Sequence, residues 1–208
     1  MALSDLYANL NLLLRWLHVI FGITWLGLLY FFNFVNVPML AVLDDTGKRI
    51  VSSQLMPRAL WWFRWGAKFA LLAGLGLFMM NYMYAPGAGF GSSPLMRDAE
   101  GLTGRAQWIM FGMTLGIIMW IIVWFIIWPA QKKMLRGKVA ADLIPGLRRR
   151  VFLVSRFNAY LSGPMLFGML APAHYGAFNM VTVVVVSAVG VLVIWLAVKA
   201  SSSVGASA

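Results

Sequence analysis

Five long apolar stretches constrain the fold of this chain more than any other feature of its sequence. A helix needs about 20 predominantly apolar residues to cross the hydrocarbon core of a bilayer. Lipid offers no partners to the backbone, so only helices and closed barrels span it. We therefore predict an all-α integral membrane protein, a bundle of about five transmembrane helices forming one domain over residues 1–208. The predicted spans are 10–37, 60–84, 106–128, 151–172 and 176–198.

The composition excludes an ordinary soluble globule. Hydrophobic residues make up 62% of the chain and charged residues only 11%, whereas a soluble domain is roughly half apolar and a quarter charged. The net charge of +11 would suggest nucleic acid in a soluble protein, but the basic residues lie between the apolar spans, where cytoplasmic loops of membrane proteins carry them. We therefore expect the lipid bilayer as the surroundings and no nucleic-acid partner.

Three long connections join the first four predicted spans. The first, 40–58, is predicted to hold a short surface helix that starts near Asp44 and is closed by Pro57. The second, 85–105, is rich in glycine, proline and serine, which predicts an irregular loop. The third, 129–150, holds seven basic residues against a single acid. No internal repeat and no separate soluble domain are visible.

The charges of these connections predict the orientation in the membrane. The third connection carries seven basic residues and the first carries Lys48, Arg49 and Arg58, whereas the two arginines of the second are offset by two acids. Because cytoplasmic loops are enriched in Lys and Arg, we predict an N-terminus outside and a C-terminus in the cytoplasm. His18 and His174 then lie on the same, non-cytoplasmic side.

Small residues recur every four positions on three of the predicted spans. Such faces let helix backbones approach closely in lipid, and we expect them to pack against neighbouring helices. Pro164 is predicted to kink the fourth span, because proline cannot donate the helical hydrogen bond. The small residues are Gly66, Ala70 and Gly74, then Gly112 and Gly116, then Ser155, Ala159 and Gly163.

One face of the first span carries residues suited to a haem. At helical spacing Arg15, His18, Gly22 and Trp25 lie on the same face. A neutral imidazole can bind haem iron axially, the glycine leaves room for the flat macrocycle, and the arginine can pair with a propionate. We therefore predict a noncovalent b-type haem on the outer side, with His18 as one axial ligand of the iron and His174 as the second.

A structural interpretation of the same residues stays open. His18 then forms a hydrogen bond across helices, Arg15 extends to the membrane surface and His174 lies in a hydrated turn. The chain has no cysteine. Disulfides, iron–sulfur clusters and covalent c-type haem are therefore excluded within this sequence, and a metal would need histidine or another non-thiolate ligand.

Six further polar residues lie within the predicted spans, all toward the cytoplasmic side. Long basic side chains reach the membrane surface there at little cost, and a path for a substrate is the alternative interpretation. All six carboxylates lie in connections or near a terminus, which argues against a proton-coupled transporter and against acid–base catalysis in the spans. The six polar residues are Asn33, Asn36, Arg64, Lys68, Arg156 and Asn158.

Three stretches resemble a known family. They are RWLHVIFGITWLG (15–27), ALWWFRWGAKFALLAGLGL (59–77) and SRFNAYLSGPMLFGMLAPAHYG (155–176). They are similar to the membrane domain of the bacterial urate hydroxylases that are fused to a cytochrome c, the urate oxidase N-terminal family. The resemblance implies an inner-membrane redox protein that passes electrons toward cytochrome c outside. This sequence is shorter than that family's and contains no CxxCH motif.

A second similarity is confined to LHVIFGITW (17–25). This stretch is similar to the membrane protoporphyrinogen oxidases and the copper-resistance membrane proteins, which also set a histidine ahead of a tryptophan in an apolar helix. The similarity implies a porphyrin or a metal at His18.

Three functions remain open on the sequence. The first is a membrane subunit of a redox or electron-transfer system that holds b-type haem and exchanges electrons with a cytochrome c or a larger respiratory complex. The second is a non-catalytic structural subunit that packs against a larger respiratory or photosynthetic membrane complex. The third is a membrane enzyme that oxidises urate or a porphyrin. We expect a membrane-protein partner or a homo-oligomer.

Overall fold

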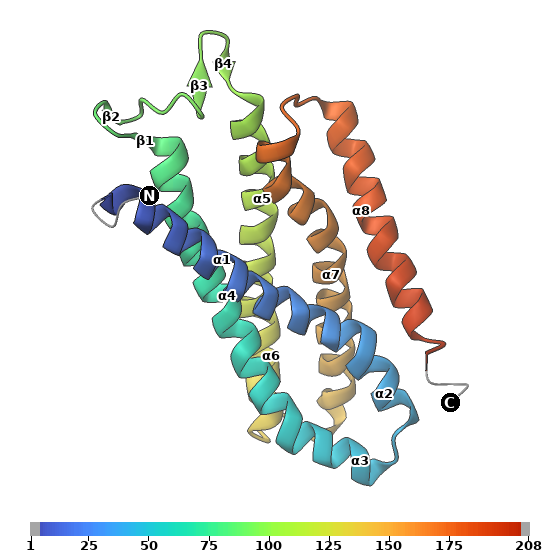
Figure 1. Ribbon diagram of the computed structural model, residues 1–208. Coiled ribbons are helices and arrows are strands. Elements are labelled where there is room, and N and C mark those ends of the chain that lie inside the picture. The colour runs from blue at the N-terminus through green and yellow to red at the C-terminus, as the bar shows by residue number, and fades with distance from the viewer. Residues whose placement is uncertain (1–4, 205–208) are drawn as a thin grey trace.

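Helices form most of the structure, a computed structural model that describes residues 5–204 (Figure 1). Two long helical rods come first along the chain, and each contains π-helical segments. The first rod consists of α1 (Leu6–Tyr30), η1 (Phe31–Asn36) and α2 (Val37–Val42). The second consists of α3 (Asp45–Ile50), η2 (Val51–Leu55), α4 (Met56–Phe78) and η3 (Met79–Met83).

Two small antiparallel hairpins follow the second rod. Strand β1 (Tyr84–Ala85) pairs with β2 (Gly89–Phe90), and β3 (Arg97–Asp98) pairs with β4 (Gly101–Leu102). Gly87, between β1 and β2, has a φ of 83°, a left-handed conformation that glycine adopts without steric cost. The sequence predicted an irregular loop here. The two hairpins could not be predicted, because strands of two residues are too short to show an alternating pattern of apolar and polar residues.

The third rod and two further helices complete the chain. The third rod consists of α5 (Gly104–Ile121), η4 (Ile122–Ile127) and α6 (Trp128–Leu135). A short 3₁₀ turn, η5 (Ala141–Leu143), leads into α7 (Ile144–His174), and α8 (Met180–Ser201) follows. The predicted last span starts earlier than α8, because Asn179 caps this helix by accepting a hydrogen bond from the backbone N–H of Thr182.

Within residues 5–204, four helical stretches are long and apolar enough to cross a membrane. The all-α membrane class is therefore confirmed. The predicted span 151–172 lies on α7, which is not one of the four because polar and small residues and two internal prolines dilute its apolar side chains. The count of five spans stays a prediction. The four stretches are Leu6–Val42, Asp45–Met83, Gly104–Leu135 and Met180–Ser201.

Pro57 does not close a surface helix, contrary to the prediction. The start of α3 is as expected, with the Asp44 side chain accepting from the Gly47 N–H at 2.7 Å, but the helix continues through η2 into α4. Proline clashes with the carbonyl four residues earlier, and a π-helical segment ahead of it, with hydrogen bonds spanning five residues, relieves that conflict. Pro38 and Pro129 also follow π-helical segments.

The helices pack in pairs through small residues: α1 lies along α4, α5 along α7, and α7 along α8. A Cβ added to Gly112 would lie 2.8 Å from the carbonyl carbon of Gly168, so the backbones of α5 and α7 are in contact. Gly163 meets Gly190 of α8 backbone to backbone in the same way, and Gly66 packs against α1. The predicted use of small residues for helix contacts is therefore confirmed at these positions.

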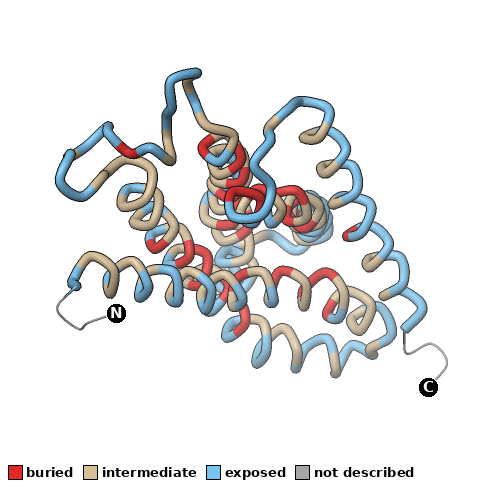
Figure 2. Tube along the Cα trace, turned by 45° about the horizontal axis from the view of Figure 1, so that its top comes forward, coloured by how far each residue is buried: buried red, intermediate tan, exposed pale blue. Residues whose placement is uncertain are grey.

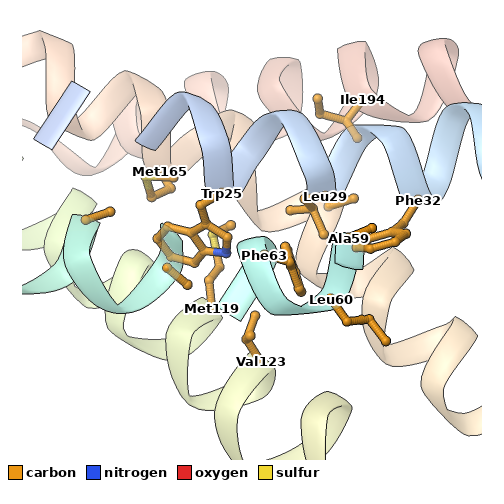
Figure 3. Close-up of a cluster of buried hydrophobic side chains, with 13 residues drawn as sticks. Trp25, Leu29, Phe32, Ala59, Leu60, Phe63, Met119, Val123, Met165 and Ile194 are labelled. Atoms are coloured by element: carbon orange, nitrogen blue, oxygen red, sulfur yellow. The ribbon is translucent and has the colours of Figure 1, made fainter. Parts of the chain in front are cut away.

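The core lies where the helix pairs meet. Trp25 and Leu29 of α1 point into one cluster with Phe63 of α4, Met119 of α5 and Met165 of α7 (Figure 3). Helix α8 contributes only Ile194 and is exposed along most of its length (Figure 2). Its exposed valines and leucines suit contact with lipid. In Figure 1 the α1–α4 pair and the α5–α7–α8 group diverge toward the hairpins.

Candidate functional site

His18 lies at the contact between α1 and α4. Its Nδ1 atom is 2.8 Å from the carbonyl oxygen of Ala70. Because a carbonyl can only accept, Nδ1 carries a proton and donates it to Ala70, and Nε2 is the ring nitrogen that this hydrogen bond leaves unused. A Cβ added to Gly74 would lie 2.8 Å from Cε1 of His18. The glycine therefore makes the room that the imidazole occupies.

The hydrogen bond across helices that the structural interpretation predicted is present. It does not use the nitrogen that a metal would need. Histidines that ligate metals usually donate their other ring N–H to a carbonyl or a carboxylate, which fixes the ring and raises the basicity of the ligating nitrogen. Among the described residues no hydrogen bond to Nε2 of His18 is found. His18 therefore resembles a metal-binding histidine in one respect: one ring nitrogen donates to a backbone carbonyl, that of Ala70, and the other is not used by a hydrogen bond.

Gly22 and Arg15 lie beside His18 on the less crowded side of α1. A Cβ added to Gly22 would meet no atom within 4 Å. Nε of the exposed Arg15 donates to Oδ1 of Asn11 at 2.7 Å, and Nη2 donates to Oδ1 of Asn81 in η3 at 3.3 Å. An open hollow of about 350 Å³ adjoins these polar groups. Its lining residues are Tyr7, Ala8, Asn11, Leu12, Arg15 and Asn81.

Trp25 does not share this open space. Its side chain is 6% exposed and packs in the core, with Nε1 buried and unpaired (Figure 3). His174 is exposed at the end of α7. The loop that follows it is held by Trp108, whose Nε1 donates to the carbonyl of Ala177 at 2.8 Å. No contact between His174 and His18 is found among the described residues.

A search of residues 5–204 finds no group of three or more His, Asp or Glu side chains that could hold a metal ion. A haem needs only one or two axial protein ligands. The predicted roles of His18 and His174 as iron ligands therefore stay predictions.

A second polar group lies between α4 and the third rod. The guanidinium carbon of Arg64 is 3.7 Å from the ring centroid of Trp128, and Nζ of Lys68 is 4.8 Å from that of Trp65. Trp124 joins the two helices, because its Nε1 donates to the Arg64 carbonyl at 3.2 Å and its ring meets Trp65 edge-on. Sequence reasoning named both cations but missed their aromatic partners.

Buried polar side chains link the first rod to α7. Nδ2 of Asn33 donates to Oγ of Ser155 at 3.1 Å, and the hydroxyls of Tyr30 and Ser162 are 2.9 Å apart. Asn158 is fully buried, and neither polar atom of its side chain has a partner. The side chains of Asn33 and Asn158 lie in the interior of the bundle. They therefore do not reach the membrane surface as long basic side chains can.

The fold and these interior polar groups define the class as an all-α membrane protein with candidate binding groups between its helices. The sequence profile of the family described as urate oxidase N-terminal matches residues 95–203, just over half of the chain. The chain belongs to this family, as the resemblance predicted. The stretch 155–176 lies inside the match, whereas 15–27 and 59–77 lie before it. No curated protein and no solved structure matches the chain.

Proposed function

We propose that this protein is a membrane redox protein that holds a b-type haem at His18 on the non-cytoplasmic side. One observation carries the proposal: the carbonyl of Ala70 fixes the Nδ1–H of His18 and leaves Nε2 available. The open space at Gly22, four residues after His18 along α1, would suit a flat ring. When bound, the haem would supply one-electron transfer.

The residues around His18 have separate roles in this proposal. The Ala70 carbonyl orients the imidazole by accepting its Nδ1–H. Asn11 and Asn81 hold Arg15 through two of its N–H groups, and the remaining N–H groups would pair with a propionate. His174 would be the second residue to hold the haem, a role that requires the loop after α7 to approach α1.

The proposal includes the predicted topology. Helix α7 would be the fourth of five spans in a bacterial inner membrane, with the N-terminus outside. Support comes from the basic residues, which gather where α6 ends and α7 begins, at the end of the bundle away from the hairpins (Figure 1). His18 lies in the half of the first rod, Leu6–Val42, that is nearer the N-terminus, so a haem held there would serve the exchange of electrons with a cytochrome c or a larger respiratory complex outside.

A reduced-minus-oxidised spectrum of the purified protein tests the haem. We expect a b-type spectrum that His18→Ala abolishes and that His174→Ala shifts away from low spin or removes. Thr24→Ala is the matched control, because Thr24 also packs against α4 but does not touch His18. A purified protein without a haem band, or a His18→Ala variant with an unaltered band, would refute the proposal.

Oxidation of urate is the second candidate function, and membership in the urate oxidase N-terminal family favours it. His18 would then hold the haem, which would supply the one-electron chemistry for transfer from the substrate to an acceptor outside. The test is the consumption of urate by the purified protein with an excess of an artificial one-electron acceptor. Consumption that disappears in His18→Ala supports this function, and none with the haem-loaded protein contradicts it.

A further inference from the structure

An open groove of about 520 Å³ lies between α7 and α8, at the edge of the bundle (Figure 1). Gly163 and Gly190 bring the backbones of these two helices into contact, and the groove lies beside that contact. Its surface is almost entirely apolar. The residues that line it are Tyr160 of α7 and Ser187, Ala188, Val191, Leu192 and Trp195 of α8. We call it the α7–α8 groove.

An arginine without an acceptor lies at one end of the α7–α8 groove. Arg156 is one helical turn before Tyr160 and on the same face of α7. Its Nε and Nη1 atoms are buried without a hydrogen-bond partner. The guanidinium carbon lies 5.0 Å from the ring centroid of Phe152, but a ring face attracts the cation without accepting its in-plane N–H groups. Two charged donors therefore lack an acceptor, which is costly for buried groups.

A second cation, Lys199 of α8, lies at the same end of the groove. It follows Trp195 by one helical turn, and its Nζ is 5.3 Å from the ring centroid of that tryptophan. Arg156 precedes Gly163 by seven residues and Lys199 follows Gly190 by nine. Because α7 and α8 run in opposite directions (Figure 1), both cations lie about 10–14 Å along the helices from the glycine contact, on the same side of it.

The charges at this end of the groove are all positive along the two helices. Neither α7 nor α8 contains a carboxylate that could pair with Arg156 or Lys199. Three more arginines lie in the first two turns of α7, and they are Arg148, Arg149 and Arg150. The groove thus combines an apolar length with a basic end. A ligand that matches both parts is amphipathic, with an anionic head and an apolar chain.

We propose that the α7–α8 groove binds an anionic glycerophospholipid. One acyl chain lies along the apolar side chains, and the phosphate accepts from Arg156 and Lys199. The buried Nε–H and Nη1–H of Arg156 then gain charged acceptors. Basic pockets between membrane helices bind anionic lipid head groups in this way. This proposal goes beyond the redox function proposed for His18 and does not depend on it.

Tyr160 lies where the glycerol esters of such a lipid would be. Its Cα is about 6 Å farther from the start of α7 than that of Arg156, and its side chain lines the groove. Its hydroxyl makes no hydrogen bond among the described residues. Because the ester carbonyls of a glycerophospholipid lie between the phosphate and the acyl chains, we expect this hydroxyl to donate to one of them.

Native mass spectrometry of the purified full-length protein in a nonionic detergent tests the proposal. The probe is dioleoyl phosphatidylglycerol, and the comparison is phosphatidylcholine with the same acyl chains. We expect saturable binding of phosphatidylglycerol that is about fivefold tighter or more, because each basic residue near a membrane surface attracts net negative charge by roughly that factor. Phosphatidylcholine carries a phosphate too, but its choline cation cancels the net charge.

Three substitutions remove polar groups from the proposed site. Arg156→Gln should weaken the binding of phosphatidylglycerol about tenfold, and Lys199→Gln about fivefold. Tyr160→Phe keeps the ring and should weaken it severalfold. Arg58→Gln is the matched control, because the exposed Arg58 lies near the start of α4, at the same end of the bundle but outside the groove. This control should bind the lipid as the unaltered protein does.

Ala188→Trp tests the apolar part of the site. The added ring fills the groove and leaves both cations in place, so it should weaken binding severalfold. Val189→Trp is its control, because Val189 is the next residue of α8 and does not line the groove. Ala188 and Lys199 are exposed, so their variants keep the proposal testable even where Arg156→Gln fails to fold. His18→Ala should retain the lipid, which separates this proposal from the haem proposal.

Several results would overturn the proposal. One is equal binding of phosphatidylglycerol and phosphatidylcholine by the unaltered protein. Another is unchanged binding by Lys199→Gln and Ala188→Trp. Displacement of the lipid by an equal concentration of sn-glycerol 3-phosphate would also overturn it, because this compound has the phosphate but no acyl chain. A dimer that retains no lipid and that Ala188→Trp dissociates would assign the groove to a second copy of the chain instead.

Discussion

Gly112→Ala is the smallest change that tests how the helices are packed. The added Cβ would lie 2.8 Å from the carbonyl carbon of Gly168 and 2.9 Å from the backbone nitrogen of Met169. Both neighbours are backbone atoms, so no rotation of a side chain relieves the contact. Helices α5 and α7 must therefore separate by about 0.6 Å or more to restore ordinary van der Waals distances.

The expected loss of stability follows from two opposing effects. Overpacking a close contact by one methyl group costs about 1–3 kcal/mol, while the better helix propensity of alanine over glycine returns up to about 1 kcal/mol. We therefore expect Gly112→Ala to destabilise the fold by about 1–2 kcal/mol. Gly112→Leu should cost more, and so should Ala70→Leu, because Ala70 is only 2% exposed.

Thermal unfolding of the detergent-solubilised protein, followed by circular dichroism, measures this effect. Gly27→Ala on α1 is the control, since a Cβ there would meet no atom within 4 Å. We expect a lower Tm for Gly112→Ala and an equal or higher Tm for Gly27→Ala. Equal Tm values for the two variants would refute the inferred backbone contact between α5 and α7.

Three further predictions follow from the topology and from single buried groups. Reporter fusions after Arg136 should report the cytoplasm and fusions near Ser92 the outside; the reverse at both sites would invert the orientation. Asn158→Leu should raise the unfolding free energy by about 1 kcal/mol or more, because it removes two unpaired buried atoms; a lower Tm would contradict this. Trp108→Phe should cost about 1 kcal/mol by removing the hydrogen bond to Ala177 and should speed proteolysis of the loop after α7; unchanged cleavage would count against that role.

Hydropathy predicted the helices well but their ends poorly. Each predicted span lies mainly on a helix, because an apolar run long enough to span lipid must satisfy its backbone groups internally. Pro57 was wrongly predicted to end a helix. Proline breaks a helix when the residues before it form α-helical hydrogen bonds. The residues before Pro57 form the π-helical segment η2 instead, so the rule does not apply there. Nothing in the residue types alone distinguishes a π-helical approach to proline from a helix end.

The face predicted around His18 divides into two in the structure. At 100° per residue, Arg15 and Gly22 lie to one side of His18 and Trp25 lies to the other. Because of this difference in angular position around α1, Trp25 is buried in the core, whereas the space beside Gly22 is open. The partner of His18 could not be predicted from the sequence, since a backbone carbonyl is present at every residue and only the register of α1 against α4 selects Ala70.

Helix α4 supplies part of both candidate sites, from opposite sides. Ala70 faces His18, whereas Lys68, two residues earlier and about 200° around the helix, faces Trp124 of the third rod. The family match begins after α4, so it includes Trp124 but not the residues that fix His18. A change that displaces α4 as a whole should therefore disturb haem binding at His18 and the packing of Arg64 against Trp124 and Trp128 together. Filling the space at Gly74 should disturb haem alone, because its added Cβ would meet the imidazole of His18.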